Sequence, residues 1–534
     1  MSSEDRAAWD VLVVGAGPSG LATAAALHAY GASVLVVDEQ LGRVRESRAL
    51  AVQPRTLELL NGFGLADELV RRGNPAVRLH LHLGRREVRT DLFGVGLEDS
   101  AYPFLLFVSQ AETEALLGDH LAGEGVAVER GVAAERISET STGCEVTIRD
   151  DDGALRDVRA RYVVGCDGAY STVRAEAGIP FVGGGYPQTF VLADLDVDGL
   201  EPGAVHSFLT DSGPFFFFPL VRPAGWRVIA VRSASPDAST GPVGTDELQR
   251  LADDATGGSV RLHEPVWATA FRIQHRHAAT YRAGRLFVAG DAAHIHSPAG
   301  AQGMNTGIQD GINVGWKLAL VCRGRAPDSL LDTYDLERRP VGAMVLRFTD
   351  RAFNAATSAR PAVRFVRRRV APLVVPFVLG LRPVRALGFR RVSQLDIAYR
   401  CGQAVDRRRS RLARGPYAGD RLPDAAISID GRPGRLHDAL RRKGFQLLLV
   451  GEPETWDRGV SDTLVTEHPG MLSVQLLSRE PGPGVLHDAT GVAFRRLRVR
   501  GAAVFVVRPD GHIGHRIDEP DLDGARRYLS GVLS

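Results

Sequence analysis

The first 38 residues constrain the fold more than any other stretch, because two strands, a helix and a glycine-rich turn follow one another directly. Asp10–Val14 and Ser33–Val37 are short, apolar segments of the kind that form buried strands. The alanine-rich segment Leu21–Tyr30 between them has the composition of a helix. This βαβ unit predicts an α/β protein with a parallel sheet.

Each residue type in the turn GAGPSG has a physical task. Gly15 allows a tight turn, Gly17 lets the backbone approach a pyrophosphate, and Gly20 lets helix and strand pack closely. Asp38 closes the second strand, where its carboxylate can accept hydrogen bonds from ribose hydroxyls. Strand, glycines, helix, strand and acid in this register predict a nucleotide site. Its predicted residues are Gly15, Gly17, Pro18, Ser19, Gly20, Asp38 and Glu39.

Two later strands also end in a carboxylate. The apolar segment Tyr162–Gly165 leads to Asp167, and Leu286–Ala289 leads to Gly290 and Asp291. Ligands of open α/β sheets lie at the carboxyl ends of the strands. Packing alone does not explain two such ends in a chain with a nucleotide turn, so both are predicted to line the site.

The segment after Asp291 is a loop with few side chains that runs into a helix. Pro298–Gly300 and Gly303 form the turn, and Thr306 and Gln309 have the spacing of a capping box. A helix N-terminus presents free N–H groups and the positive end of the helix dipole. The loop and helix are therefore predicted to hold negative charge on a bound group.

Composition narrows the classes of function. A chain of 534 residues is too long for one core, so two or three domains are expected. A net charge of +2 gives no reason to expect nucleic acid or a membrane as partner. The four cysteines form no CxxC or Cys/His cluster, which argues against a disulfide framework or a metal site and fits a reducing compartment. We expect a cytoplasmic protein that is a monomer or a homodimer.

Residues 78–94 and 181–271 are rich in β-branched residues and turn glycines. They predict an antiparallel sheet that forms one face of a substrate cavity. The expected strands include His206–Leu209, Phe215–Leu220 and Arg227–Val231.

The four consecutive phenylalanines of this sheet cannot all face the cavity, because side chains alternate along a strand. Either Phe215 and Phe217 or Phe216 and Phe218 line the pocket, and the sequence leaves both pairs open. The alternative is that all four are core aromatics.

The last third of the chain changes character twice. Val345–Arg400 is expected to be helical, with Val363, Val366, Val370 and Val374 packed inside and arginines at a solvated rim. Beyond Gly415, new strands and a last helix are predicted. These are Phe445–Val450, Leu472–Leu477, Ala503–Val507 and the helix Leu522–Leu529.

Three motifs, GAGPSG, GCDGAYSTVR and RLFVAGDAAHIHSPAGAQGMNTGIQDGINVGWKL, resemble in order and spacing those of the single-component FAD-dependent aromatic hydroxylases, the group A flavoprotein monooxygenases. The likeness is strongest to the aromatic polyketide hydroxylases of antibiotic pathways. It extends to ESRALAVQPRTLELL, the Gln110 helix, SQLDIAYR and RPDGHIGHRID, and so covers nearly the whole chain.

The resemblance implies three domains. The first is a Rossmann-like FAD-binding domain of the glutathione reductase type, residues 1–77, 95–180 and 272–400. The second is an inserted antiparallel-sheet substrate domain, residues 78–94 and 181–271. The third is a thioredoxin-like domain without CxxC, residues 415–534.

The resemblance also implies roles for residues around the cofactor. Asp38 would bind the ribose, Arg48 and Gln110 would contact FAD, Asp291 would hold the ribityl chain, and Asp167 would support the pyrophosphate side. The residues implied to face the isoalloxazine are Pro298, which would also line the substrate pocket, Gly303, Met304 and Asn305.

One residue departs from the family pattern. Ala301 stands where the family most often has glycine, and it would be strained if that position requires a positive φ.

The chemistry implied is that of non-covalent FAD, reduced by NADPH or NADH, which reacts with O₂ to form a C4a-hydroperoxide that hydroxylates a phenolic ring. The predicted substrate is a multi-ring aromatic polyketide, because the Phe215–Leu220 strand offers no cation to pair with a small carboxylate. No catalytic acid or base is assigned. His294 and His296 are expected to be structural imidazoles bonded to the backbone.

Other functions remain open at this point. A Baeyer–Villiger monooxygenase of the same family would insert oxygen beside a ketone, and these motifs do not separate the two reactions. A flavin oxidase or dehydrogenase and a non-catalytic flavoprotein that binds a polyketide are further alternatives. A flavin halogenase should carry WxWxIP, which this sequence lacks.

Overall fold

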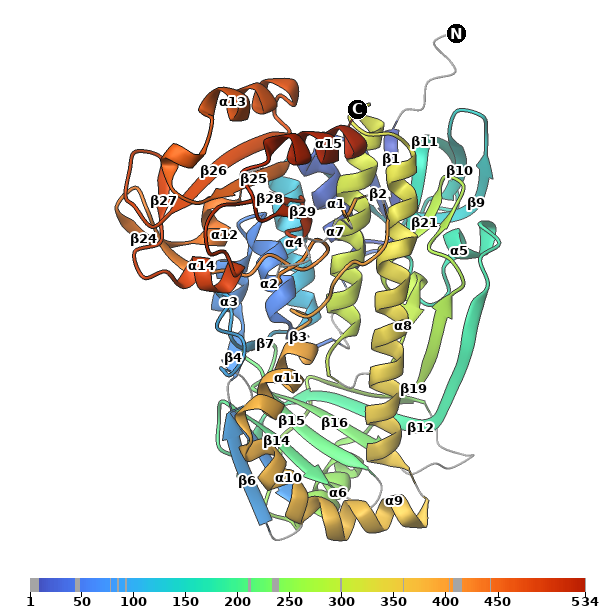
Figure 1. Ribbon diagram of the computed structural model, residues 1–534. Helices are drawn as coiled ribbons and strands as arrows, with labels where there is room; N and C mark the ends of the chain where they lie inside the picture. The colour runs from blue at the N-terminus through green and yellow to red at the C-terminus, as the bar shows by residue number, and fades with distance from the viewer. Residues whose placement is uncertain are drawn as a thin grey trace.

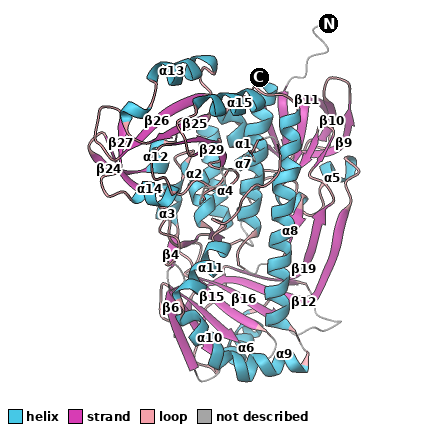
Figure 2. Cartoon of the chain, viewed as in Figure 1, coloured by secondary structure: helices cyan, strands magenta, loops and turns pink. Residues whose placement is uncertain are grey.

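The computed structural model describes residues 9–533 apart from 44–48, 77, 84–85, 92–93, 210–212, 233–239, 298–299, 359, 403, 407–414 and 442. Within these residues the chain builds sheets of eight, nine and seven strands around a central group of helices (Figures 1 and 2). Helices α7 (Gly303–Cys322) and α8 (Ser329–Thr357) run through the middle of the molecule. The expected mixed α/β fold is confirmed.

The eight-stranded sheet has a parallel core in the order β21, β11, β1, β2 and β8. These strands are Leu286–Val288, Leu155–Gly165, Trp9–Val14, Val34–Asp38 and Val128–Arg130. The four strands predicted here are therefore present. Because they are parallel, the carboxyl ends of β1, β11 and β21 meet at one edge, as the strand-end carboxylates required.

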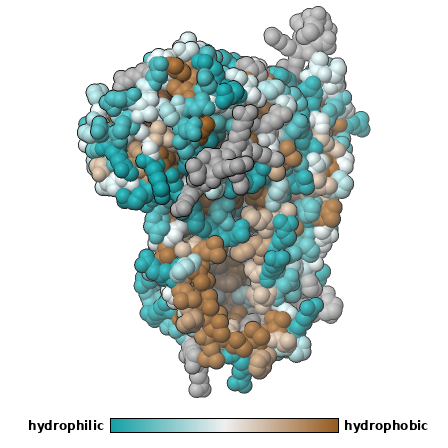
Figure 3. Space-filling view, in the orientation of Figure 1, coloured by the Kyte–Doolittle hydropathy of each residue, from teal (hydrophilic) through white to brown (hydrophobic). Residues whose placement is uncertain are grey.

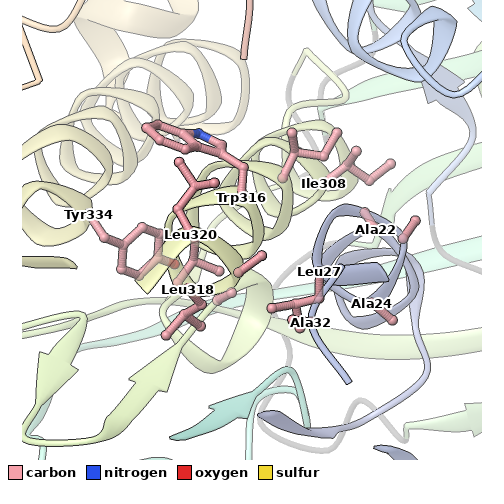
Figure 4. Close-up of a cluster of buried hydrophobic side chains, with 14 of the residues drawn as sticks. Ala22, Ala24, Leu27, Ala32, Ile308, Trp316, Leu318, Leu320 and Tyr334 are labelled. Carbon is pink, nitrogen blue, oxygen red and sulfur yellow. The ribbon is translucent and has the colours of Figure 1, made fainter. Parts of the chain in front are cut away.

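Helix α1 (Pro18–Ala29) follows β1 and packs directly on α7. A Cβ at Gly311 would lie 2.5 Å from the carbonyl oxygen of Ser19, and one at Gly315 would lie 2.6 Å from Cβ of Ala26. The two helices are thus closer than side chains at these glycine positions would allow. Figure 4 shows the buried cluster at this contact, with Ala22, Ala24, Leu27, Ile308, Trp316, Leu318 and Leu320.

The nine-stranded sheet has the main order β17-β19-β12-β16-β15-β14-β5-β6, and β22 (His294–Ile295) pairs with β19. Strand β17 is Gly241–Pro242. Its principal strands are β12 (Phe181–Leu195), β19 (Trp267–Ala278), β16 (Trp226–Arg232), β15 (Pro214–Pro219), β14 (Ala204–Leu209), β5 (Arg78–Leu83) and β6 (Arg86–Asp91). The expectation of an antiparallel sheet is wrong for one pair, because β5 runs parallel to β14. No hairpin links these two strands, so no turn fixes their relative direction.

The two faces of β15 separate the four phenylalanines. Phe215 and Phe217 are buried in an apolar cluster with Leu248 and Ala252 of α6 (Thr245–Thr256), on the outer face of the sheet. Phe216 and Phe218 are partly buried on the opposite face. There they join a cluster that also contains Ala301, in the loop before α7.

The seven-stranded sheet of the C-terminal region has the order β24-β23-β27-β26-β25-β28-β29, and its first three strands are Arg432–Arg435, Ala426–Ile429 and Val485–His487. Strands β25 (Phe445–Val450) and β26 (Leu472–Ser478) are parallel and are connected by α13 (Arg458–Glu467). Strands β28 (Ala503–Val507) and β29 (Ile513–Ile517) are antiparallel additions on the other side of β25. All the strands predicted after Gly415 are present, and the last helix is α15 (Leu522–Val532).

Buried ion pairs join this C-terminal sheet to the central helices. Glu337 of α8 accepts hydrogen bonds from Lys317 of α7 at 2.7 Å and from Arg508 at 2.7 and 2.8 Å, and Arg508 also pairs with Asp510 at 2.6 Å. Burial raises the pKa of Glu337, but Arg508 and Lys317 outweigh it and lower that pKa to about 2. Residues from three elements thus share one desolvated charge network.

Helices α9 (Pro361–Phe365), α10 (Ala371–Gly380) and α11 (Arg382–Val392) contradict one prediction. Their described residues include none that is buried, and Val366, Val370 and Val374 are exposed instead of packed. The valines do recur at helical spacing, but no other element covers that face. No single helix of the described chain is long and apolar enough to cross a membrane, although α10 and α11 pass that test together as a pair bent by 91°.

The α1–α7 contact yields the first prediction. Gly311→Ala should lower the thermal midpoint of unfolding, because the added methyl group would contact backbone atoms and not a flexible side chain. It should also weaken ligand binding by the Gly15–Gly20 turn that precedes α1. Overpacking of this kind costs about 1–3 kcal/mol. Gly123→Ala, in α4 (Gln110–Gly123) with nothing within 4 Å of the new Cβ, is the matched control. An unchanged midpoint for Gly311→Ala in differential scanning fluorimetry would contradict the contact.

Candidate functional site

The candidate site lies where the carboxyl ends of four parallel strands meet. Backbone hydrogen bonds connect these ends in succession, each N–H donating to the carbonyl of the neighbouring strand. The pairs are Gly15 to Val37 at 2.7 Å, Cys166 to Val14 at 2.7 Å and Ala289 to Gly165 at 2.9 Å. The three motifs, up to 275 residues apart (Gly15 to Gly290), therefore form one continuous edge.

The glycines of GAGPSG have the conformations expected from their spacing. Gly15 has φ +100°, and a Cβ there would lie 2.4 Å from the carbonyl oxygen of Cys166. A Cβ at Gly20 would lie 1.8 Å from the carbonyl oxygen of Gly15, so only glycine lets α1 start this close to the loop. Gly17 has no atom within 4 Å of its Cβ position, which leaves that side of the turn open.

Asp38 braces the same loop from the end of β2. Its carboxylate accepts hydrogen bonds from the N–H of Ala16 at 2.5 Å and of Gln40 at 2.8 Å. The neighbouring Glu39 is exposed. A buried acid bonded to the glycine turn and an exposed one beside it both lie at the rim where a ribose would sit in such a fold.

Ser19 brings the first motif into contact with the third. Its Oγ lies 2.3 Å from the position of a Cβ at Gly290 and 2.2 Å from one at Gly307. Pro18 is the first residue of α1, where its missing N–H has no consequence. The start of α1, the end of β21 and the first turns of α7 therefore converge on one small volume.

The two strand-end carboxylates have different surroundings. Asp167 accepts a hydrogen bond from the N–H of Val173 at 3.1 Å, and burial raises its pKa. Asp291 is exposed in a short 3₁₀ turn, Gly290–Ala292, immediately after β21. Asp167 thus shapes the start of a helix, whereas Asp291 is exposed just beyond the end of β21.

The predicted capping box at the start of α7 is wrong. The helix begins at Gly303 after Gln302, with no side-chain cap, so Thr306 and Gln309 lie inside it. The Oγ1 of Thr306 donates to the Gln302 carbonyl at 2.9 Å, and Gln309 bonds Gln394 at 2.5 Å. The spacing was matched by chance, because a helix start that leaves its N–H groups to a ligand needs no cap.

Side chains clamp the loop before α7 in place. The amide of Asn305 donates to the carbonyls of Ala51 and Ala301, both at 2.8 Å, and its oxygen accepts from the N–H of Gln53 at 2.8 Å. The Gln302 amide donates to the Gly300 carbonyl at 2.8 Å. Gly303 is partly buried, and Met304 and Asn305 are buried. The Gln302 amide also donates to the Val392 carbonyl at 2.9 Å, and the Gln53 amide donates to the Gly300 carbonyl at 2.9 Å. Neither glutamine had a sequence signal, because these partners are distant in the chain.

Ala301 occupies the strained conformation that its position suggested. Its φ is +52°, and Gly300 before it has φ +79°, so two successive residues are left-handed. An alanine pays roughly 1–2 kcal/mol for this region, which costs glycine little.

Gln110, Arg48 and Pro298 are the remaining residues with a predicted cofactor contact. Gln110 is the first residue of α4, and Ser109 caps this helix. The Gln110 amide oxygen accepts from the N–H of Ala49 at 3.4 Å, and its nitrogen donates to Glu114 at 2.7 Å. Arg48, directly before Ala49, and Pro298 lie outside the described residues.

His294 is structural in a way that the sequence did not indicate. Its Nε2 lies 2.6 Å from the carboxylate of Asp310, not on a backbone group as expected. The same carboxylate accepts from Arg338 at 2.6 Å and from the N–H of Gly290 at 3.3 Å. Burial raises the pKa of Asp310, but Arg338 and His294 outweigh it and lower that pKa. Asp310 therefore ties α7 and α8 to the end of β21.

His296 does contact the backbone as expected, with its Nδ1 2.9 Å from the carbonyl oxygen of Ser297. Burial lowers its pKa to about 4, so its imidazole is neutral at neutral pH. Among the described residues, no group of three His, Cys, Asp or Glu side chains could hold a metal ion.

The strand edge has the geometry of a dinucleotide-binding site, and comparison with known proteins identifies its class. The FAD binding domain family matches residues 8–349. 6-Methylpretetramide 4-monooxygenase from Streptomyces rimosus is 37% identical over 521 residues, covering 94% of this chain and 90% of that protein.

Solved structures give the same result. Anhydrotetracycline hydroxylase from Streptomyces rimosus superposes with a TM-score of 0.77 at 29% identity, covering 98% of this chain and 99% of that one. Aklavinone-11 hydroxylase in complex with FAD and aklavinone has a TM-score of 0.79 at 27% identity, covering 99% and 98%.

The chain therefore belongs to the FAD binding domain family. It is an FAD-dependent aromatic monooxygenase. The residues present fit the cofactor, because the open turn at Gly17 and the uncapped start of α7 leave backbone N–H groups for a pyrophosphate and for the flavin.

Ala301 generates the second prediction. Ala301→Gly should raise the thermal midpoint of the flavin-loaded protein, with a gain of about 0.5–1 kcal/mol after the added entropy of the unfolded chain is subtracted. Ala289→Gly is the control, because Ala289 has φ −140° and glycine there should only destabilise. A lower midpoint for Ala301→Gly would mean that the methyl group contributes more to packing than it costs in strain.

Proposed function

We propose that this monooxygenase hydroxylates a multi-ring aromatic polyketide in antibiotic biosynthesis, using NADPH or NADH as the reductant. The observation that carries the proposal is the shared apolar cluster of Phe216, Phe218 and Ala301, which sets a broad aromatic wall opposite the flavin loop. Phe218 lies 5.5 Å from the ring of Phe107 and 5.4 Å from that of Phe216, as ring centroids. Flat fused rings bury wide area against such a wall.

The charges behind this wall also favour a substrate without a carboxylate. Arg227, the second residue of β16, is fully buried and donates two hydrogen bonds of 2.6 and 2.7 Å to Asp194. Its remaining amino group donates to the carbonyl of Ala49 at 2.8 Å. A buried cation already paired in this way has no charge left for a benzoate-type substrate.

The cofactor would be held by the residues of the strand edge. Asp38 and Glu39 would contact the adenosine ribose, the turn Gly15–Gly20 the pyrophosphate, and Asp291 the ribityl chain, with Asp167 supporting the loop. Arg48 and Gln110 would add contacts near Ala49. Bound FAD supplies the redox and oxygen-activating chemistry. The dipole of α7 would stabilise negative charge on the reduced flavin, with Pro298, Gly303, Met304 and Asn305 beside it.

The domain boundaries follow the same proposal. Residues 1–77, 95–180 and 272–400 would bind FAD, and 78–94 with 181–271 would cover the substrate. Residues 415–534 would form a thioredoxin-like domain, supported by the order β26-β25-β28-β29 with a helical crossover between β25 and β26. Because no cysteine follows Cys401, its role would be structural, through the buried Glu337–Arg508 pair.

The function is tested by incubating the flavin-loaded protein with NADPH, ¹⁸O₂ and a panel of anthraquinone- and angucycline-like phenols. Mass spectrometry should show one ¹⁸O atom added to a ring carbon and NADPH consumption that depends on the substrate. Insertion of ¹⁸O into an ester would instead establish Baeyer–Villiger chemistry. Substrate binding without turnover would leave only a carrier role.

Alanine variants of the two phenylalanine pairs should have different effects, one on substrate binding and the other on stability. Phe216→Ala with Phe218→Ala should raise KM for the fused-ring substrate and leave FAD content unchanged, since these rings face the flavin loop. Phe215→Ala with Phe217→Ala should chiefly destabilise the protein, by about 3–5 kcal/mol per buried ring. Steady-state kinetics and thermal midpoints separate the effects. Efficient turnover of 4-hydroxybenzoate, or a KM indifferent to Phe216 and Phe218, would place the cavity elsewhere.

A further inference from the structure

The surface formed by α9, the π-helical turn Val366–Val370, α10 and α11 is the largest exposed apolar feature of the described chain. Of the sixteen large hydrophobic side chains that are exposed among the described residues, nine lie between positions 365 and 387. They are Phe365, Val366, Val370, Leu373, Val374, Phe377, Leu381, Val384 and Leu387. We call these nine residues the apolar face.

The apolar face is continuous. Within each helical segment its positions follow one another by one, three or four residues, so they recur on one side of that segment. The side chain of Phe377 is 70% exposed and that of Leu387 is 73% exposed. Single exposed apolar residues are common on protein surfaces, whereas a contiguous group of them indicates an interaction site. Figure 3 shows apolar residues gathered over this lower part of the molecule, beside a hollow in the surface.

The helices are anchored to the protein by their other side. Arg390 of α11 pairs with Asp99 at 2.6 Å, Arg385 donates to Thr90 Oγ1 of β6 at 3.3 Å, and Phe389 packs against the cluster that contains Phe216. The apolar face is therefore presented outward from a fixed base.

The charge of this segment has a single sign. Between Asp350 and Asp396 the sequence contains ten arginines and no aspartate or glutamate. The ten are Arg351, Arg360, Arg364, Arg367, Arg368, Arg369, Arg382, Arg385, Arg390 and Arg391. Arg364, Arg369 and Arg382 are exposed and flank the apolar face. The net charge of the whole chain is only +2, so it does not reveal that this segment carries arginine alone. For that reason the net charge gave no indication of a membrane partner.

We propose that the apolar face is a docking surface for an anionic lipid membrane. Exposed Phe, Leu and Val side chains would enter the region between headgroups and acyl chains, while the arginines pair with anionic headgroups. A second copy of this chain fits less well, because apposing two such faces by symmetry would bring arginines against arginines. The bend of 91° between α10 and α11 suits helices that lie in the interface plane and do not cross it.

The position of this surface is consistent with delivery of an apolar substrate. A cavity of about 170 Å³ lies beside α11 and is lined by Phe348 and Arg351 of α8 and by Arg391 of α11. Gln302, in the loop before α7, and Gln394, whose amide donates to Gln302, also line it. This consequence rests on the proposed function, whereas membrane docking itself does not.

Vesicle flotation of the flavin-loaded full chain tests the proposal. The protein should float with vesicles that contain phosphatidylglycerol and not with pure phosphatidylcholine vesicles, and high salt should release it. Phe377→Ser with Leu387→Ser should weaken binding by at least about tenfold, since each side chain contributes buried apolar area. Arg364→Gln with Arg369→Gln and Arg382→Gln should weaken it by about fivefold for each charge removed.

A matched control removes equally exposed apolar side chains elsewhere. Leu155→Ser with Val266→Ser, 61% and 60% exposed in the parent, should leave vesicle binding unchanged. All variants should retain FAD, read from the flavin absorbance, which separates loss of docking from loss of fold and leaves the proposed chemistry untouched. Binding that ignores lipid charge would overturn the proposal. So would a concentration-dependent dimer in sedimentation velocity that Phe377→Ser with Leu387→Ser abolishes.

Discussion

The close approach of α1 to α7 is the contact on which the rest of the structure depends. Glycine at positions 20, 307, 311 and 315 lets backbone meet backbone, with Ser19 inserted between Gly290 and Gly307. Both helix N-termini therefore open at the same edge of the parallel sheet. An extra methyl at any of these glycines would separate the two ends that hold the two halves of one dinucleotide.

Buried charge then holds the other elements around this centre. Asp310 joins α7, α8 and the end of β21 through Arg338, His294 and Gly290. Glu337 joins α7 and α8 to the C-terminal sheet through Lys317 and Arg508. In each network the buried carboxylate is paired with a buried arginine, so removal of one partner leaves an uncompensated charge and costs far more than the intact pair contributes. These pairs specify one relative position of the sheets.

The candidate site and the exposed helices after α8 differ from the interior in how their charged and apolar groups are arranged. In the proposed site, the cofactor edge offers backbone N–H groups and a few carboxylates. The proposed substrate wall offers aromatic area beside the buried Arg227, which Asp194 neutralises. The helices beyond α8 instead leave apolar side chains uncovered within an arginine-only segment. A large apolar substrate, as proposed for this enzyme, would give a physical reason for both features, because such a molecule is poorly soluble in water.

Local rules determined much of this protein from sequence alone. The βαβ unit, the strand-end carboxylates, several strands of each of the three large sheets and the strain at Ala301 depend on residues that are neighbours in the chain. Only the tertiary structure decided which phenylalanine pair faces the flavin loop, because alternation fixes two faces without saying which one is covered. The same holds for His294 with Asp310, for the parallel pairing of β5 with β14 and for the uncovered valines of α9 to α11. Helical and strand periodicity reports that a side is apolar, whereas what lies against that side is set by segments hundreds of residues away.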